Sequence, residues 1–386
     1  MRMMAHTLLF LAALASGCGR SSEPLVFGHV DPKSEDDAEY RALALAVDAT
    51  NADAAKQPFE RRVNIVHGAA GKTPDEALAQ AVRLAAVDKV FALLGGYRAA
   101  IAERISQAAQ ENAVLAFTFG GWAGPTANPY VFPVGISPAD QGKWLAQHAR
   151  DQLKLSKVVM LVNEESPLHK AIADAFAHEL GKAHAVRIPI PPWSQLQGKH
   201  VNAEPEIDRA LRRVTEAKAD ALYVGTDAAD SLDWIGRLQG GKEPTPAVLF
   251  GGEEGDLAAL REDGRAVGWY AASAFFAGDD SPRLKEFVEA YRKKFNANPP
   301  AAAVLAHDAY QVLLQACRKA GEPSAAKLRE ELRKKDASFE VLTGALSYTT
   351  DQTARRPGFV VRLRKEGDEL VKRFDPASSE TPAPTP

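Results

Sequence analysis

Short apolar segments alternate with helix-like segments along most of the 386-residue chain. The runs VVMLV at residues 158–162 and AVLF at residues 247–250 are apolar at every position, as strands must be when both faces of their sheet are covered. Repeated strand–helix units of this kind predict a parallel, doubly wound sheet. Because a chain of this length exceeds what one hydrophobic core usually holds, we expect an α/β fold with two such lobes.

Several of the expected helices carry a start signal. Thr73 can cap the helix that follows it, Pro74 suits the first helical position, and Glu76 stands three residues after the cap. This spacing predicts a capping box. Ser-Pro pairs mark three further expected helix starts, at residues 137–138, 166–167 and 281–282.

The N-terminus predicts export. Arg2 precedes a short apolar run, Thr7 to Ala15, in the layout of a secretory signal, and the run is too short for a membrane-spanning helix. Small residues precede Cys18, as they do in the bacterial lipobox. We therefore expect a signal peptide at residues 1–17, then a lipidated Cys18 and a linker that together span residues 18–24. The alternative is a plain signal peptide with an incidental cysteine, since Ala15 stands where a large aliphatic residue is usual.

Composition excludes several other classes of protein. The second cysteine, Cys317, lies in an apolar helical stretch, and we expect it to be a small buried residue. Residues 375–386 have nothing to bury, so we expect a disordered tail. A net charge of −3 does not suggest a nucleic-acid or anionic-membrane partner. The phosphate-loop, dinucleotide, serine-hydrolase and zinc-protease motifs are absent, so we expect no catalysis, no cofactor and no metal.

Paired glycines end three of the expected strands. They occur in LLGG at residues 93–96, FTFGG at residues 117–121 and LFGG at residues 249–252. Glycine lets the backbone approach a bound group closely, and open parallel sheets bind ligands beyond the carboxyl ends of their strands. The three pairs together suggest a binding rim, although each turn alone is explained by the need for glycine.

The order of the segments resembles the type I periplasmic solute-binding proteins, in the branched-chain-amino-acid (Leu/Ile/Val)-binding family of ABC transporters. The segments that carry this resemblance are ALAVDATNA, DKVFALLGG, NPYVFPVGISPADQG, HDAYQVLLQACRKAG and TGALSYTTD. They fall in the family's order over about 350 residues. The expected lipobox fits as well, because many such receptors are lipoproteins.

The resemblance implies two lobes joined by three crossovers, with a small-molecule ligand closed between them. Lobe 1 would comprise residues 25–135 and 278–335, and lobe 2 would comprise residues 136–277 and 336–374. The implied partner is the permease of an ABC transporter. The implied location is periplasmic or extracytoplasmic, with membrane attachment through the N-terminal lipid only.

The resemblance also implies ligand contacts. Glu254 in GGEEG stands where amino-acid binders place the acid that holds the ligand's ammonium group, a charge-assisted pair. Thr118 stands in the loop that offers a hydroxyl to the ligand's carboxylate, beside Phe119, Gly120 and Trp122. The alternatives are a solvated loop acid at 254 and core aromatics at 119 and 122.

Four positions depart from the amino-acid-binding pattern. Tyr97 and Arg98 replace small hydroxyl residues, while Leu168 and Asp227 stand where aromatic residues are common. Arg98 either binds a ligand carboxylate or pairs with an acid on the rim. An amino acid or related compound is the expected ligand. The departures leave open a larger apolar solute, or a sensor of the same fold that signals to a partner protein.

Overall fold

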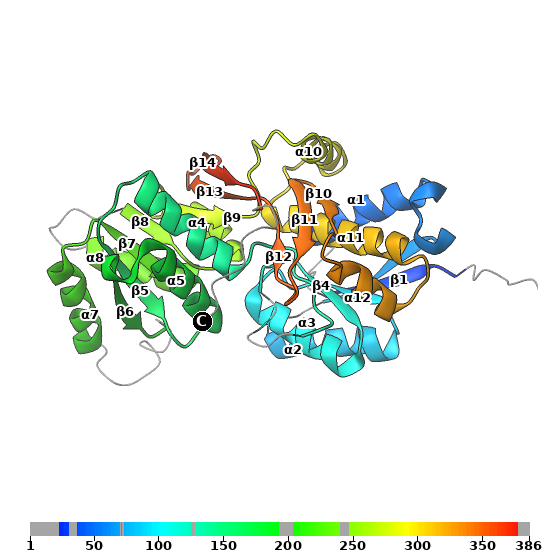
Figure 1. Ribbon diagram of the computed structural model, residues 1–386, viewed down its shortest axis with the longest axis horizontal. Helices are drawn as coiled ribbons and strands as arrows, with labels where there is room; N and C mark the ends of the chain where they lie inside the picture. Colours follow the sequence, from blue (N-terminus) through cyan, green and yellow to red (C-terminus); the bar gives the residue numbers. More distant parts are fainter. Residues whose placement is uncertain are drawn as a thin grey trace, which may run out of the picture.

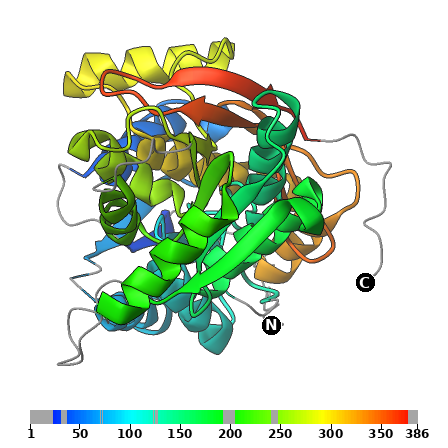
Figure 2. The same ribbon diagram turned by 90° about the vertical axis from the view of Figure 1, so that its left-hand side faces the viewer.

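The computed structural model describes residues 23–30, 37–69, 71, 73–122, 124, 128–192, 204–239 and 247–376. The expected signal peptide, the lipidation site Cys18 and residues 377–386 of the expected tail lie outside these ranges. The chain forms two α/β lobes that lie side by side in Figure 1, and Figure 2 shows the same pair with lobe 2 facing the viewer.

Lobe 1 is built on a four-stranded parallel sheet in the order β2-β1-β3-β4. The strands are β1 (Leu25–Val30), β2 (Val63–Gly68), β3 (Ala92–Gly95) and β4 (Leu115–Thr118). Helices α1 (Ala38–Asn51) and α11 (Ala301–Ala320) cover one face, where they share a core with Phe27 and Phe117. Helices α2 (Pro74–Val82) and α3 (Ala99–Asn112) cover the other face, over Leu93 and Ala116.

Lobe 2 is built on a seven-stranded sheet in the order β14-β13-β9-β8-β7-β5-β6. Its parallel strands are β5 (Val158–Asn163), β6 (Ala185–Ile190), β7 (Ala221–Gly225), β8 (Ala247–Phe250) and β9 (Tyr270–Ser273). Two antiparallel strands, β13 (Gly358–Arg362) and β14 (Glu369–Phe374), extend one edge.

Helices cover both faces of this second sheet. Helices α4 (Pro138–Asp151) and α5 (Pro167–Leu180) pack on one face with Met160 and Val162. Helices α7 (Glu204–Ala217), α8 (Ala228–Gln239) and α9 (Leu257–Asp263) pack on the other with Val159 and Leu161. Because successive residues of a strand face opposite sides, strands covered in this way are apolar at every position. The predicted α/β architecture with two doubly wound lobes is confirmed.

Local sequence signals correspond to the observed helix starts. Thr73 and Glu76 form the predicted capping box at the start of α2. Each of the three Ser-Pro pairs begins a helix, at α4, α5 and α10 (Pro282–Phe295). Cys317 is fully buried in α11, as expected for a small core residue.

The segment after α12 (Ala325–Arg333) is where the expected lobe boundary needs revision. Strands β10 (Phe339–Val341), β11 (Gly344–Tyr348) and β12 (Ala354–Arg355) form a separate antiparallel sheet. This sheet packs on α11, where Gln315 exchanges two side-chain hydrogen bonds of 2.8 Å with the backbone of Glu340. We therefore propose that the third crossover lies at about residue 357 instead of at 335–336, because residues 337–355 pack with lobe 1.

A buried arginine ties the crossovers together. The Arg356 side chain is 1% exposed and donates to the backbone oxygen of Val134 at 2.6 Å, in the first crossover. It also pairs with the carboxylate of Asp308 in α11 at 2.9 Å and donates to the Thr343 hydroxyl at 3.1 Å. Arg356 therefore links the first crossover and the turn before β11 to α11, the central helix of lobe 1.

Candidate ligand-binding site

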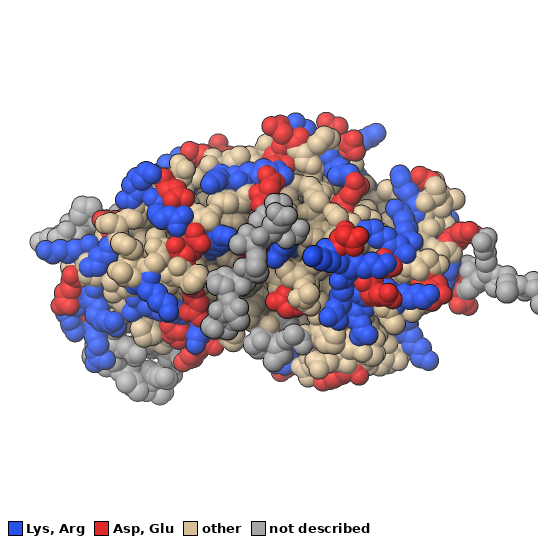
Figure 3. All heavy atoms as spheres, in the orientation of Figure 1, with Lys and Arg blue, Asp and Glu red and all other residues tan. Residues whose placement is uncertain are grey.

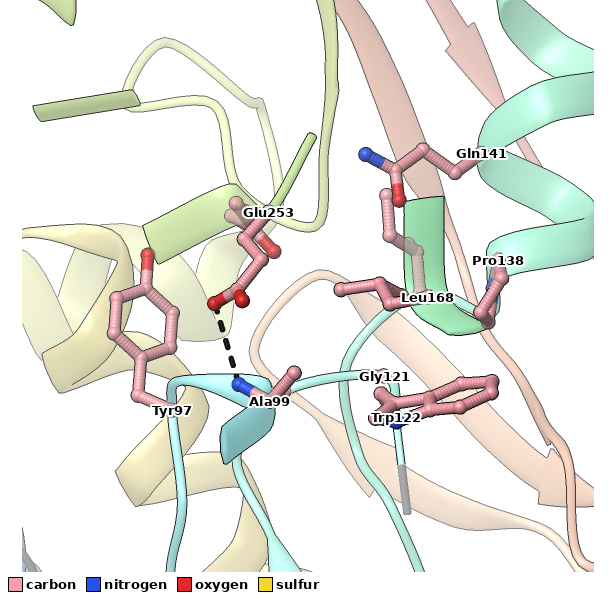
Figure 4. A pocket seen from close by; sticks show the side chains of 11 residues that line it. Tyr97, Ala99, Gly121, Trp122, Pro138, Gln141, Leu168 and Glu253 are labelled. Atoms are coloured by element: carbon pink, nitrogen blue, oxygen red, sulfur yellow. Dashed lines mark hydrogen bonds between the residues drawn. The ribbon is translucent and has the colours of Figure 1, made fainter. Parts of the chain in front are cut away.

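A small cavity lies between the lobes, at the carboxyl ends of strands from both sheets (Figure 4). Lobe 1 contributes the loops after β3 and β4, and lobe 2 contributes the starts of α4 and α5 and the loop after β8. The cavity has a volume of about 30 Å³, room for a few water molecules. It is lined by Tyr97, Ala99, Gly120, Gly121, Trp122, Ile136, Pro138, Gln141, Leu168, Glu253 and Glu254.

Glycine shapes the lobe 1 wall by allowing close backbone approach. A Cβ on Gly121 would lie 1.6 Å from the backbone oxygen of Ile136, in the first crossover. Gly96 has a φ of +75°, and a Cβ there would lie 2.7 Å from Cα of Ala102 in α3. Two of the predicted glycine pairs are therefore required by the packing of the rim itself, before any ligand is considered.

Glu254 is held in the wall of the cavity by two donors from the end of β9. Its Oε1 accepts hydrogen bonds from the Ser273 hydroxyl at 2.6 Å and from the Ala274 N–H at 2.7 Å. Burial raises the pKa of Glu254, and these two hydrogen bonds and the charges of Arg356 and Arg261 act against that rise. Within the described part of the chain, Glu254 takes part in no ion pair. It is thus a carboxylate fixed by hydrogen bonds and not by an ion pair with any described residue.

Glu253 reaches across the cleft to lobe 1. Its Oε2 accepts a hydrogen bond of 3.2 Å from the N–H of Ala99, the first residue of α3 (Figure 4). Unpaired N–H groups and the helix dipole make a helix start favourable for a negative charge. Burial raises the pKa of Glu253, and the charge of Arg98 acts against that rise. The anion-binding position of lobe 1 is therefore taken by a carboxylate of lobe 2.

Arg98 makes the second polar link between the lobes. Its Nη1 lies 3.0 Å from Oδ1 of Asp256, and its Nε lies 3.9 Å from Oε2 of Glu253. Asp256 is in turn held by the N–H of Ala228 at 3.1 Å. Of the two roles considered for Arg98 from the sequence, pairing with rim acids is the one that this structure contains.

The opposite wall of the cavity is apolar. Figure 4 shows Trp122, Leu168 and Pro138 on the side away from Tyr97 and Glu253. The Trp122 ring is fixed by its Nε1, which donates to Glu103 at 3.1 Å. Tyr97 stays protonated, because burial and then the charge of Glu254 raise its pKa far above the ordinary value. The site therefore presents the Glu253 carboxylate and a phenol on one side, and on the other an apolar surface beside the amide of Gln141.

Four residues predicted for the site do not line the cavity. Thr118 and Phe119 are fully buried below it, where Phe119 packs against the ring of His29. The other two, Asp227 and Arg98, bond to residues at the edge of the cavity. Asp227 accepts from the N–H of Asp230 at the start of α8, and Arg98 pairs with acids as described. Thr118 and Phe119 follow one another in the core, and only the last three residues of FTFGGW line the cavity.

Six lining residues were not among the predicted ligand contacts, although one of them, Gly121, belongs to the predicted glycine rim. They are Ala99, Gly121, Ile136, Pro138, Gln141 and Glu253. The segments GGEEG and NPYVFPVGISPADQG, quoted for the family resemblance, contain four of them. Gln141 is among these, and its Nε2 donates to the backbone oxygen of Gly252 at 2.6 Å, which joins α4 to the acidic loop.

Two α/β lobes with a polar and apolar cavity between them define a two-lobed binding protein that closes on a small molecule. Comparison with known proteins gives the family. The model of the periplasmic binding protein family matches residues 28–368, so the chain belongs to this family, whose members bind small molecules and work with ABC-transporter permeases. In the described residues, no helix is long and apolar enough to span a membrane.

The relatives span almost the whole chain. A Leu/Ile/Val-binding protein homolog 7 of Brucella abortus (strain 2308) is 25% identical over 375 residues, 89% of each chain. A leucine binding protein of Thermotoga maritima has a TM-score of 0.71 at 20% identity, covering 91% of this chain and 98% of its own. A solute binding protein of Rhodopseudomonas palustris BisB5, in complex with 3,4-dihydroxybenzoic acid, has a TM-score of 0.69 at 18% identity, covering 92% and 99%. These likenesses show the type I periplasmic-binding-protein fold.

Proposed function

We propose that this chain is a lipid-anchored extracytoplasmic receptor that encloses a small molecule between its lobes and delivers it to an ABC permease, without catalysis of its own. The observation that carries the proposal is that both lobes line one cavity, while polar contacts cross between them beside it. Only a closed pair of lobes can contact a ligand from both sides, so ligand binding favours closure.

The named relatives define the first solutes to test. The curated relative carries a Leu/Ile/Val-binding name, and the Rhodopseudomonas structure contains an aromatic acid. Amino acids and related small solutes are therefore the default class. The apolar wall formed by Trp122 and Leu168 also supports solutes with a sizeable hydrocarbon part.

The test is a thermal-shift screen of the purified protein against amino acids, amines, amides and aromatic acids. At about a thousand times the dissociation constant, binding stabilises the folded state by roughly 4 kcal/mol, which gives a readable rise in Tm. A binding solute is also expected to change tryptophan emission, and Trp122→Phe is expected to remove most of that change. A screen in which no solute raises Tm would contradict the proposal.

The proposed lipid anchor can be tested separately, because it depends on Cys18 alone. In the organism's own membranes, the wild-type chain is expected to sediment with the membrane fraction, and Cys18→Ser to appear in the soluble extract. If both chains fractionate alike, Cys18 is not the anchoring residue.

A further inference from the structure

The charges around the cleft are unbalanced. Glu253 and Glu254 line the cavity, and Asp256 lies just behind them in η5 (Glu254–Asp256). The eleven residues that line the cavity in the described part of the chain include no Lys, Arg or His. Outside the lining, Arg98 pairs with Asp256 at 3.0 Å and lies 3.9 Å from Glu253, while Glu254 takes part in no ion pair of the described residues. A solute that enters therefore meets more negative than positive charge.

Figure 3 shows no comparable excess of either charge on the face that it draws. On the face drawn, Lys and Arg side chains are interspersed with Asp and Glu over both lobes. Two carboxylates from one short loop that share a partly buried space are unfavourable as a pair of anions unless a cation lies near them. Burial is the largest cause that raises the pKa of Glu253 and of Glu254, so a ligand cation beside these two buried groups would favour their charged forms.

The position where a ligand carboxylate would gain most is occupied by the protein itself. The start of α3 is the helix terminus that faces the cavity from lobe 1. Its first N–H, that of Ala99, donates a hydrogen bond to Oε2 of Glu253. A carboxylate-bearing solute would have to displace Glu253 from this N–H and then lie beside Glu254. Thr118, the other expected carboxylate partner, is fully buried.

We propose that the cleft selects a small solute that carries a positive charge and no carboxylate, with its charge between Glu253 and Glu254 and its hydrocarbon part against Trp122 and Leu168. A primary amine with a branched or aromatic body has this chemistry. The inference rests on the proposed function, and it narrows the solute class of the same site. It sets this chain apart from relatives and structural neighbours named for amino acids or bound to an aromatic acid.

Three solutes with the same hydrocarbon part separate the charges. Leucine carries an ammonium and a carboxylate, 3-methylbutylamine carries the ammonium alone, and 4-methylpentanoate carries the carboxylate alone. Calorimetric titration of the purified protein at about pH 7.5 is expected to give 3-methylbutylamine at least tenfold tighter binding than leucine. It is expected to give 4-methylpentanoate the weakest binding of the three.

Variants test the two carboxylates. Glu254→Gln is expected to weaken amine binding about 10- to 100-fold, the usual range for a hydrogen bond to a charged group. Glu253→Ala frees the Ala99 N–H, so leucine binding is expected to strengthen relative to amine binding by at least tenfold. Glu366→Gln, which removes an exposed carboxylate in the turn between β13 and β14, is the matched control and is expected to change neither affinity.

The possible results distinguish failure of the inference from failure of the proposed function. Tighter binding of leucine or 4-methylpentanoate than of the amine would overturn the inference and leave the binding function intact. So would a screen in which only neutral or anionic solutes raise Tm. A screen in which no solute of any charge raises Tm would overturn the proposed function as well. Binding of a different carboxylate-free amine in place of 3-methylbutylamine would support the inference.

Discussion

Two clusters of charged residues lie where the lobes meet, and they are built differently. At the crossovers, Arg356 and Asp308 are 1% and 0% exposed, and each has further hydrogen-bond partners. In the cleft, Arg98 is half exposed and pairs across the lobes with Asp256. Glu254 lies nearby, outside any ion pair of the described residues.

This difference predicts that the Arg356–Asp308 contact is permanent and that the Arg98–Asp256 contact is reversible. A buried ion pair whose groups are all hydrogen-bonded holds its place, because losing one partner leaves a buried charge without compensation. In the cleft pair, water reaches the half-exposed Arg98 although Asp256 is buried, so this pair contributes less to stability and can open and close. The crossover cluster is therefore expected to stay in place, and the cleft cluster can respond to a ligand.

The largest effect is expected at the crossover. Arg356→Leu leaves the Asp308 carboxylate buried beside apolar groups and removes the donor to Val134. It is expected to lower the free energy of unfolding by about 3–5 kcal/mol. Urea unfolding followed by circular dichroism measures this loss. A loss below about 1 kcal/mol would show that the crossover cluster is no more important than a surface pair.

An intermediate effect, dependent on pH, is expected at Glu254. Its raised pKa means that the folded chain binds this proton more tightly than the unfolded chain, so ionisation of Glu254 destabilises the fold as pH rises above 4.5, its ordinary value. Glu254→Gln removes this ionisation. The free energy of unfolding of the variant, minus that of wild type, is expected to increase as pH rises from 4.5 and to level off above the raised pKa.

Urea unfolding at several pH values gives this difference directly. The raised pKa of Glu254 also predicts that amine affinity falls as pH is lowered toward 4.5, because protonation of Glu254 removes the charge that attracts the ligand. If the stability difference is independent of pH, Glu254 does not ionise in an unfavourable setting, and the contrast with Asp308 fails.

The smallest change in stability is expected at the cleft arginine. Arg98→Ala removes a pair whose arginine is 49% exposed but whose Asp256 carboxylate is 4% exposed, so the free energy of unfolding is expected to fall by about 1 kcal/mol, less than at Arg356. The lobes, however, lose a cross-lobe contact. Small-angle scattering is therefore expected to show a larger radius of gyration than wild type.

A matched control lies on the same helix. Arg104 pairs with Asp75 at 3.0 Å, but both residues belong to lobe 1. Arg104→Ala is expected to leave the radius of gyration unchanged. Equal radii for all three proteins would show that the Arg98 contact does not hold the lobes together.

Local sequence patterns predicted the helix starts and the buried strands of this fold. The capping box of Thr73 and Glu76 and the all-apolar strands are determined by neighbouring residues, so they were predicted from the sequence. The contacts that define the site join distant residues. Glu253 bonds to a residue 154 positions away, and Arg356 bonds to one 222 positions away. No spacing rule relates such pairs.

The predicted site residues show the same contrast between local patterns and long-range contacts. Glu254 was predicted because the family pattern places an acid there, and it lines the cavity. Its neighbour Glu253 was missed, because only the folded chain brings it to the start of α3. Thr118 was predicted for a ligand carboxylate but is fully buried, because its side chain lies in the core below the paired glycines.

The central claim is that a solute binds between the lobes at Glu254. The most direct test is calorimetric titration of wild type, Glu254→Gln and Glu366→Gln with the solute that raises Tm most. The account predicts one site per chain, at least tenfold weaker binding to Glu254→Gln, and unchanged binding to Glu366→Gln. Equal affinities for all three proteins would contradict it, because the solute would then bind elsewhere.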